Sequence, residues 1–504
     1  MVDNKRIAKN TLFLYFRMIL IMGVTLYMSR IVLEILGVDD FGLYNIMGGV
    51  VGMLSFLNGT LSIGTSRFLT YELGTGNPDK LKQTFSTAFY AHVILAVIIL
   101  VIMESIGLWY VYNKMIIPPD RFSACIWVFH LSILTTFVAI TQVPYTSIIL
   151  AHEKMEIYAY ISILEAFAKL AACYLLTIGS LDRLILYAAL LTTIQIIVSL
   201  CYRIYCIRHF EESKLNCSFN KSILKKLLSF SGWNIMANIS NTLGYQGNLV
   251  LINLFFTSAL AAAQSIAGQV SNALMVFVNN FRHAINPQVI KLYAAGDKEG
   301  SKRLTLETTV YCFDLILMLG LPAIVVMNEL MHIWLVEVPE YAVIFTQWII
   351  ARNIIGTFSS SFYTPMLAAN KMKINSIAAV ILGVGEFVLL YVFLKIGFGP
   401  MWIQYLGCIV TIGFSLIVKP FVLIKQIDYT IKEILICYWI CLKTLALSCF
   451  LSILPIIYLS NDVANSIIKA ILVGGAVVIS SYIFLGKQTR KKLNLFIKCK
   501  LHLC

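Results

Sequence analysis

Apolar stretches of twenty or more residues recur along the whole chain, from Thr11 to Leu485. Each stretch can cross a hydrocarbon layer of about 30 Å as a helix that rises about 1.5 Å per residue. Hydrophobic residues make up 59% of the 504 residues and charged residues only 13%, whereas soluble domains carry about a quarter charged residues. The sequence therefore predicts an all-α polytopic membrane protein with about fourteen transmembrane helices.

The loops between these spans differ in charge from one side of the membrane to the other. Loops 203–226 and 291–303 are rich in Lys and Arg, whereas the loops around Asp39, Asp182 and Glu337 carry acids and few bases. The positive-inside rule places the basic loops in the cytosol, together with both termini. The basic residues that give the net charge of +14 then determine the topology and face anionic lipid headgroups. Nucleic acid is therefore not expected as a partner.

An internal repeat divides the predicted spans. Residues 151–157 and 368–374 share Ala, Lys, Met and Ile in register, and both follow a span on the cytosolic side. An even number of spans separates the two copies, so they have parallel orientation. We expect two parallel six-helix bundles, followed by two additional helices and a basic cytosolic tail. The predicted bounds are 1–215, 222–428, 434–485 and 486–504.

Several cations lie inside the spans, where a charge needs a cavity or a partner because burial in lipid costs about 2.5 to 3.5 kcal/mol. Arg352 lies about 14 Å into its span and is the first candidate for contacting a substrate. Arg17 is the second candidate, although its side chain can also reach the cytosolic interface. Arg282 ends a run of polar residues, and Lys169 lies four residues after Glu165, which also suits an intrahelical ion pair.

Neutral amides form stripes along two neighbouring spans. They step by three or four residues, which places them on one helix face. Either they form hydrogen bonds between helices or they line a hydrated wall, and we take them as candidate substrate contacts. The amides selected are Asn234, Asn238, Asn241 and Asn272.

Acidic residues inside the spans are candidates for ion coupling. Asp314, Glu386 and Glu104 are each either a protonatable coupling site or a neutral hydrogen-bonded carboxyl. We select Asp314, Glu386 and Glu165 as coupling candidates for a proton or sodium gradient, with the ion pair to Lys169 as the alternative for Glu165. The twelve cysteines are scattered and no tetrahedral ligand set is visible, so no metal site and no cofactor are expected. No nucleophile and base pairing stands out, and we do not expect an enzyme.

Two loop motifs carry a family resemblance. Residues 71–77 read YELGTGN, and residues 286–297 run from Asn-Pro to Gly-Asp after the eighth predicted span. With the duplicated bundles, these motifs resemble the multidrug/oligosaccharidyl-lipid/polysaccharide exporter superfamily, and the chain is most similar to its polysaccharide-transport branch. Two features depart from relatives in that superfamily. Arg17 and Arg30 are farther apart than the paired first-span arginines of lipid II flippases, and the acid that cation exporters carry in the first or seventh span is absent.

The resemblance implies a flippase in the bacterial inner membrane. It would move undecaprenyl-pyrophosphate-linked oligosaccharide repeat units for O-antigen, capsule or exopolysaccharide by alternating access. Its partners would be this substrate, membrane lipids, and the polysaccharide polymerase and chain-length machinery. The alternatives are a multidrug or cation antiporter of the same fold, which would need a buried acidic cavity, and a membrane-embedded glycan polymerase or ligase, which would need a larger outer loop.

Overall fold

The computed structural model describes residues 4–152, 154–178, 181–214, 219–227, 242–369, 371–460, 462–484 and 490. These residues form helices and turns, and no β-strand occurs among them. Eleven of their helices are long and apolar enough to cross a membrane. The predicted all-helical membrane fold is confirmed, whereas the count of about fourteen spans and the two six-helix bundles stay predictions.

The chain divides into two compact units. Unit 1 contains residues 1–266, 334–342 and 379–402, and unit 2 contains residues 267–333, 343–378 and 403–504. The helices α10 (Ser258–Ala294) and α15 (Lys373–Ile396) contribute residues to both units. The domain bounds predicted from the internal repeat are not tested by this division, and they stay predictions.

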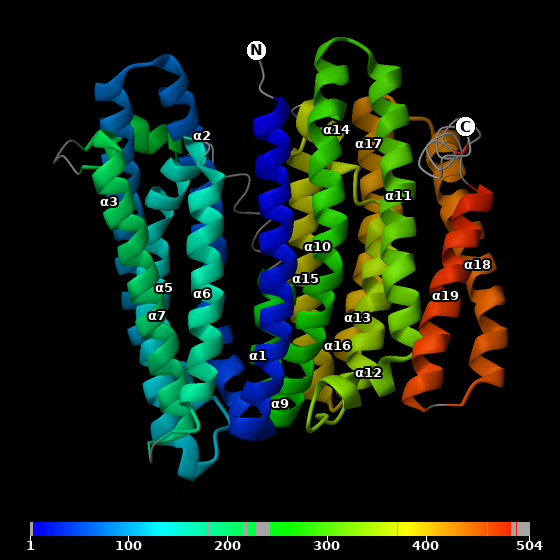
Figure 1. Ribbon diagram of the computed structural model, residues 1–504, viewed down its shortest axis with the longest axis horizontal. Coiled ribbons are helices and arrows are strands. Elements are labelled where there is room, and N and C mark those ends of the chain that lie inside the picture. Colours follow the sequence, from blue (N-terminus) through cyan, green and yellow to red (C-terminus); the bar gives the residue numbers. More distant parts are fainter. Residues whose placement is uncertain are drawn as a thin grey trace. The chain divides into compact units, whose positions relative to one another are not determined.

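Unit 1 is built on long helices that pack around an apolar core (Figure 1). Leu43, Ile99 and Phe129 come from three of these helices and are almost fully buried. The long helices are α1 (Asn4–Gly52), α2 (Ser55–Thr75), α3 (Pro78–Ile102), α5 (Phe122–Ala151), α6 (Met155–Leu175) and α7 (Arg183–His209). Shorter elements are the π-helices η1 (Met103–Gly107) and η4 (Leu243–Gly247), the 3-10 turns η2 (Pro119–Arg121) and η3 (Glu211–Ser213), α4 (Leu108–Asn113) and α9 (Asn248–Phe255).

A kink at Gly37 interrupts α1. Gly37 has φ 79° and ψ 170°, a conformation that glycine adopts at little cost because it has no Cβ. The kink leaves carbonyl groups without helical partners, and Arg183 Nη1 donates to the carbonyl oxygen of Ile35 at 3.1 Å. The sequence predicts a break between the first two spans here, and in the structure two helical segments of α1 meet at the non-helical Gly37 without a longer loop.

Unit 2 ends in a helical hairpin. The helices α18 (Ile431–Tyr458) and α19 (Val463–Phe484) lie side by side and pack against α11 (Lys298–Val325) (Figure 1). Thr430 and Glu433 form a reciprocal capping box that fixes the start of α18. The other helices are α12 (Met327–Trp334), α13 (Ala342–Thr357), α14 (Tyr363–Ala368), α16 (Trp402–Ile412), the π-helix η5 (Gly413–Val418) and α17 (Lys419–Ile427).

The predicted span at 343–369 is not one helix. Residues 358–362, which include three consecutive serines, form turns between α13 and α14. These turns are buried, and Thr364 beyond them donates from Oγ1 to Oδ1 of Asn286 on α10 at 2.8 Å. An interrupted helix exposes backbone carbonyl groups inside the protein, where they become available to side-chain donors.

Candidate functional sites

Two cationic side chains of unit 2 meet the turns between α13 and α14. Arg282 on α10 donates from Nη1 to the carbonyl oxygen of Ser360 at 2.9 Å and from Nη2 to Oδ1 of Asn279 at 3.1 Å. Lys419, the first residue of α17, donates from Nζ to the carbonyl oxygen of Ser359 at 3.3 Å. We call Arg282 and Lys419 the cation pair.

The cation pair has no acidic counterpart. Neither side chain forms an ion pair with any acid in the described part of the chain, and both are half-buried. Their charges are close enough to repel each other, and Lys419 Nζ lies 5.0 Å from the centre of the Phe414 ring. Among the described residues, carbonyl and amide oxygens, the Phe414 ring and the neutral thiol of Cys312 lie near the two charges. An anion would find here two donors for charge-assisted hydrogen bonds.

The position of the cation pair follows from the lengths of its helices. Lys419 lies about 26 Å along the helical path from Trp402, and Thr357, where α13 ends three residues before Ser360, lies about 22 Å from Ala342. Both distances approach the thickness of the hydrocarbon core, so the cation pair lies near one edge of the layer. That edge carries the loops after α14 and α17, which the sequence predicts to be cytosolic.

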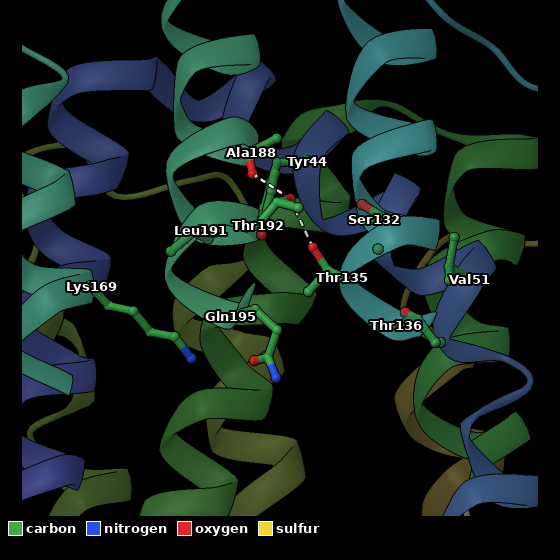
Figure 2. A pocket seen from close by; sticks show the side chains of 12 residues that line it. Tyr44, Val51, Ser132, Thr135, Thr136, Lys169, Ala188, Leu191, Thr192 and Gln195 are labelled. Atoms are coloured by element: carbon green, nitrogen blue, oxygen red, sulfur yellow. Dashed lines mark hydrogen bonds between the residues drawn. The ribbon is translucent and has the colours of Figure 1, made fainter. Parts of the chain in front are cut away.

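A separate polar pocket lies inside unit 1. Its volume is about 230 Å³, and α1, α5, α6 and α7 supply its walls (Figure 2). Polar side chains project into it from three of these helices in Figure 2, among them Thr136 from α5, Lys169 from α6 and Gln195 from α7. The lining residues are Tyr44, Gly48, Val51, Gly52, Ser132, Thr135, Thr136, Lys169, Ala188, Leu191, Thr192 and Gln195.

Hydrogen bonds hold much of this lining in place. Thr135 and Thr192 share a hydrogen bond of 2.8 Å between their hydroxyl oxygens, which joins α5 to α7. Gln195 donates from Nε2 to Oε1 of Gln142 at 2.9 Å, and Oε1 of Gln195 stays available as an acceptor. Thr136 has no hydrogen-bond partner among the described residues. The pocket therefore keeps both donors and acceptors for a ligand.

Lys169 reaches this pocket but its charge is already balanced. Its Nζ donates to Oε1 of Glu165, one turn earlier on α6, at 2.6 Å. An ammonium group carries three donors, so two N–H groups remain after this contact. Of the predicted substrate contacts in unit 1, Lys169 is the one that lines the pocket. Both predicted roles, Lys169 for substrate and Glu165 for coupling, stay predictions.

The remaining predicted cations make local contacts. Arg352 on α13 donates from Nε to Oγ1 of Thr411 on α16 at 2.9 Å. Arg17 lies over the ring of Tyr158, with Cζ 4.4 Å from the ring centre. The amide of Asn272 is exposed on α10. Asn234, Asn238 and Asn241 lie outside the described residues.

The two other coupling candidates lie on different helices. Asp314 accepts a hydrogen bond from the side chain of Ser481, which is one turn before the end of α19. About 24 Å of α11 precede Asp314, so the first turns of α11 extend beyond the end of α19. Glu386 is buried in the middle of α15. The coupling roles of Asp314 and Glu386 stay predictions.

A charged network joins three segments at the end of unit 1 that the sequence predicts to be outside the cell. Arg121 donates from Nε to Oδ1 of Asp40 at 2.8 Å and from Nη1 to Oδ2 of Asp182 at 2.6 Å. Partial burial raises the pKa of Asp182, but the hydrogen bond and the charge of Arg121, together with the backbone N–H groups of Ile185 and Leu184, outweigh burial, and the pKa lies below its usual value. This network fixes α1 and α7, which both line the polar pocket.

Sequence reasoning missed Lys419 and most of the pocket. Lys419 lies in an apolar run that the sequence assigns to a single span, and the Lys-Pro pair at 419–420 is the signal that could have marked it. Thr136 and Gln195 belong to short polar runs, with Ser132 and Thr135 in one span and with Thr192 and Ser199 in another, and this spacing of three or four residues is the signal that could have marked the pocket. Only packing brings them to one pocket.

Known structures share this fold. The lipid II flippase MurJ in its inward closed conformation superposes with a TM-score of 0.70 and 13% identity, over 95% of this chain and 98% of MurJ. An inward-facing multidrug resistance MATE family transporter of the MOP superfamily superposes with a TM-score of 0.65 and 12% identity, over 80% of this chain and 94% of the transporter. A MOP superfamily transporter from Pyrococcus furiosus superposes with a TM-score of 0.60 and 13% identity, over 84% of this chain and 97% of that transporter. Identities this low show a shared fold alone.

At the level of sequence, no curated protein matches the chain. The model of a family described as polysaccharide biosynthesis protein does match, over residues 31–338. These residues make up more than half of the chain, and the matched segment includes the lining of the polar pocket and Arg282. The chain therefore belongs to the polysaccharide biosynthesis protein family, and it has the fold of the MOP superfamily transporters.

Proposed function

We propose that this protein is a flippase that moves undecaprenyl-pyrophosphate-linked oligosaccharide repeat units across the bacterial inner membrane by alternating access. The family description supports a role in polysaccharide synthesis, and one structure with this fold is a lipid II flippase. The repeat units would serve O-antigen, capsule or exopolysaccharide synthesis. A polysaccharide polymerase and chain-length proteins would take up the product.

The cation pair is the observation that carries this proposal. Arg282 and Lys419 repel each other and no described acid balances them, so the folded protein maintains an arrangement that favours an incoming anion. A pyrophosphate carries several negative oxygens, which suit both the planar guanidinium of Arg282 and the ammonium of Lys419. Near the cytosolic edge, these groups would meet the lipid-linked substrate on the side where it is made.

Other residues have narrower proposed roles. Arg352 and Arg17 are further candidates for contacting the pyrophosphate, and the amides at 234, 238, 241 and 272 for contacting sugar hydroxyl groups. Asp314, Glu386 and Glu165 are candidates for coupling transport to a proton or sodium gradient. No cofactor is required by this mechanism, because flipping breaks and forms no covalent bond.

A multidrug antiporter is the main competing function. Its substrates are cations, which a site with two uncompensated cations would repel. The same site supplies no nucleophile and base pairing, as a glycan polymerase or ligase would need. The charge of unit 2 therefore favours the flippase.

Reconstitution distinguishes these functions. The purified protein is placed in liposomes that contain undecaprenyl-pyrophosphoryl N-acetylglucosamine, and the sugar exposed on each face is measured with a membrane-impermeant lectin. We expect protein-dependent exchange of this lipid between leaflets and no efflux of ethidium from the same liposomes. Ethidium efflux without lipid exchange would establish the antiporter instead. Protein-free liposomes give the background rate.

A further inference from the structure

The polar pocket of unit 1 differs in charge from an anion site. Lys169 and Glu165 neutralise each other, with 2.6 Å between Nζ and Oε1, and Lys169 is the one charged side chain among the described residues that line the pocket. The pocket thus presents no net charge to a ligand. An anionic group gains little here, because the ammonium already has a carboxylate partner.

The free hydrogen-bonding groups of the pocket suit a ligand that both donates and accepts. Lys169 offers two N–H groups, Gln195 offers an amide oxygen, and Thr136 offers a hydroxyl group that can do either. Sugar hydroxyl groups also both donate and accept hydrogen bonds. Val51, Leu191 and Tyr44 add apolar surface beside these groups, as the C–H faces of a sugar ring require (Figure 2).

The size of the pocket limits the ligand further. Its volume of about 230 Å³ corresponds to roughly seven water molecules, each of which takes about 30 Å³ in the liquid. Such a space holds one substituted sugar ring, and further sugars of the same glycan would lie outside it. Gly48 of α1 contributes to an open wall, since a Cβ added there meets no atom within 4 Å.

We propose that this pocket binds one uncharged sugar ring of the lipid-linked glycan. The proposal rests on the proposed flippase function, and it assigns the sugar to unit 1 while the cation pair of unit 2 takes the pyrophosphate. Thr136, Lys169 and Gln195 are the residues that contact the sugar hydroxyl groups. The sugar ring and the pyrophosphate are then bound at two different sites, one uncharged and one cationic.

A cavity-filling substitution tests the pocket. In Gly48→Leu the new side chain enters the open space of the pocket, and leucine favours the helix more than glycine does. Gly23→Leu is the matched control, because Gly23 lies on the same helix and a Cβ there also meets no atom within 4 Å. The probes are undecaprenyl-pyrophosphoryl N-acetylglucosamine and bare undecaprenyl pyrophosphate, both flipped in liposomes.

We expect Gly48→Leu to slow flipping of the sugar-bearing probe about tenfold, the effect of losing one or two hydrogen bonds. The bare lipid should change less than about twofold, and Gly23→Leu should change neither probe. If Gly48→Leu slows both probes equally, or slows neither, the sugar site is overturned and the proposed flippase function is not. Failure of the unsubstituted protein to flip either probe overturns the proposed function and the sugar site together.

A labelling experiment tests occupancy without transport. In Thr136→Cys, maleimide labelling of residue 136 is followed by peptide mass spectrometry, which separates it from the native cysteines. We expect the sugar-bearing probe to slow labelling at least about threefold more than the bare lipid does. Equal labelling with the two lipids would show that the sugar does not enter the pocket.

Discussion

The polar pocket of unit 1 and the cation pair of unit 2 differ in how their charges are balanced. In unit 1, Lys169 is paired with Glu165, Arg121 binds two aspartates, and His130 Nδ1 lies 2.9 Å from Oε1 of Glu104. In unit 2, where other cations such as Lys302 and Arg303 do pair with acids, Arg282 and Lys419 contact carbonyl and amide oxygens and a ring, and they form no ion pair within the described part of the chain. Paired charges serve the fold, whereas the uncompensated cations are explained by an anion that arrives from outside the chain.

The contrast separates stability from function. Removal of one member of a pair leaves a charge in the membrane without its partner, so the fold should lose stability. Removal of one of two mutually repelling cations relieves the repulsion, so the fold should keep or gain stability while the anion loses its site. Charge substitutions in the two units should therefore differ in the sign of their effect on stability.

The largest effect is expected at the cation pair. The double variant Arg282→Gln/Lys419→Gln should lower flipping of the lipid-linked probe about a hundredfold, because each charge-assisted hydrogen bond contributes about 1.5 to 3 kcal/mol. Its melting temperature in detergent should equal or exceed that of the unsubstituted protein. Flipping is measured in liposomes, and melting by the fluorescence of a thiol-reactive dye.

Lys443→Gln provides the control for the cation pair. Lys443 also lies in a helix of unit 2, but it is exposed and packs over the ring of Trp439, with Nζ 5.3 Å from the ring centre. Its substitution should leave flipping within about twofold. If the double variant instead melts several degrees below the control, Arg282 and Lys419 hold the turns of unit 2 together and are not an anion site.

Helix positions were largely predictable from the sequence, and the interruptions were not. Apolar length determines where a helix can cross the membrane, so hydropathy alone predicts α5, α7, α18 and α19. Hydropathy does not distinguish a loop from a kink, and Gly37 therefore bends α1 where a break was predicted. The turns at 358–362 contain three small serines between two phenylalanines and are short enough to be included in a predicted span, although they carry the carbonyl groups that bind the cation pair.

The candidate sites were predictable one residue at a time. Lys169 and Arg282 stand out because a charge inside a span is unusual, and the structure places each beside polar partners. Their surroundings depend on contacts between distant segments, such as Arg282 with Ser360 or Gln195 with Gln142. A single sequence contains no information on such contacts unless a residue pattern marks them.

A smaller effect is expected at the Lys169–Glu165 pair. Glu165→Gln leaves the ammonium of Lys169 without its carboxylate, and it should lower the melting temperature more than the double variant Glu165→Gln/Lys169→Gln does. The coupling free energy of the two substitutions should be about 0.5 to 1 kcal/mol, because the pair is partly exposed. A double-mutant cycle of unfolding free energies in mixed detergent measures this coupling.

The exposed pair Glu211 and Lys214 gives the matched cycle. Its members lie 2.6 Å apart but outside the spans, and Glu211 is exposed. Its coupling should be close to zero, since water and salt screen exposed pairs. If both cycles give the same coupling, the charges of unit 1 are solvated and the contrast between the two units does not hold.

The smallest effect concerns the network of Arg121 at the end of unit 1. The pKa of Asp182 lies below its usual value in the folded protein, so the folded state binds this proton less readily than the unfolded state. The stabilisation is complete above the usual pKa of 3.8 and is lost as the pH falls through the lowered pKa. Asp182→Asn should therefore melt about 1 °C below the unsubstituted protein at pH 6, and this difference should shrink as the pH falls below 3.8.

Asp120→Asn is the control, because Asp120 lies in the same loop as Arg121 but has no ion-pair partner in the described part of the chain. Its melting temperature should equal that of the unsubstituted protein at pH 6 and at pH 3. If the difference at Asp182 instead stays constant from pH 6 to pH 3, the oxygens of Asp182 act as neutral caps for the backbone N–H groups of Leu184 and Ile185. The ion pair with Arg121 then contributes nothing to the rigidity of the pocket helices.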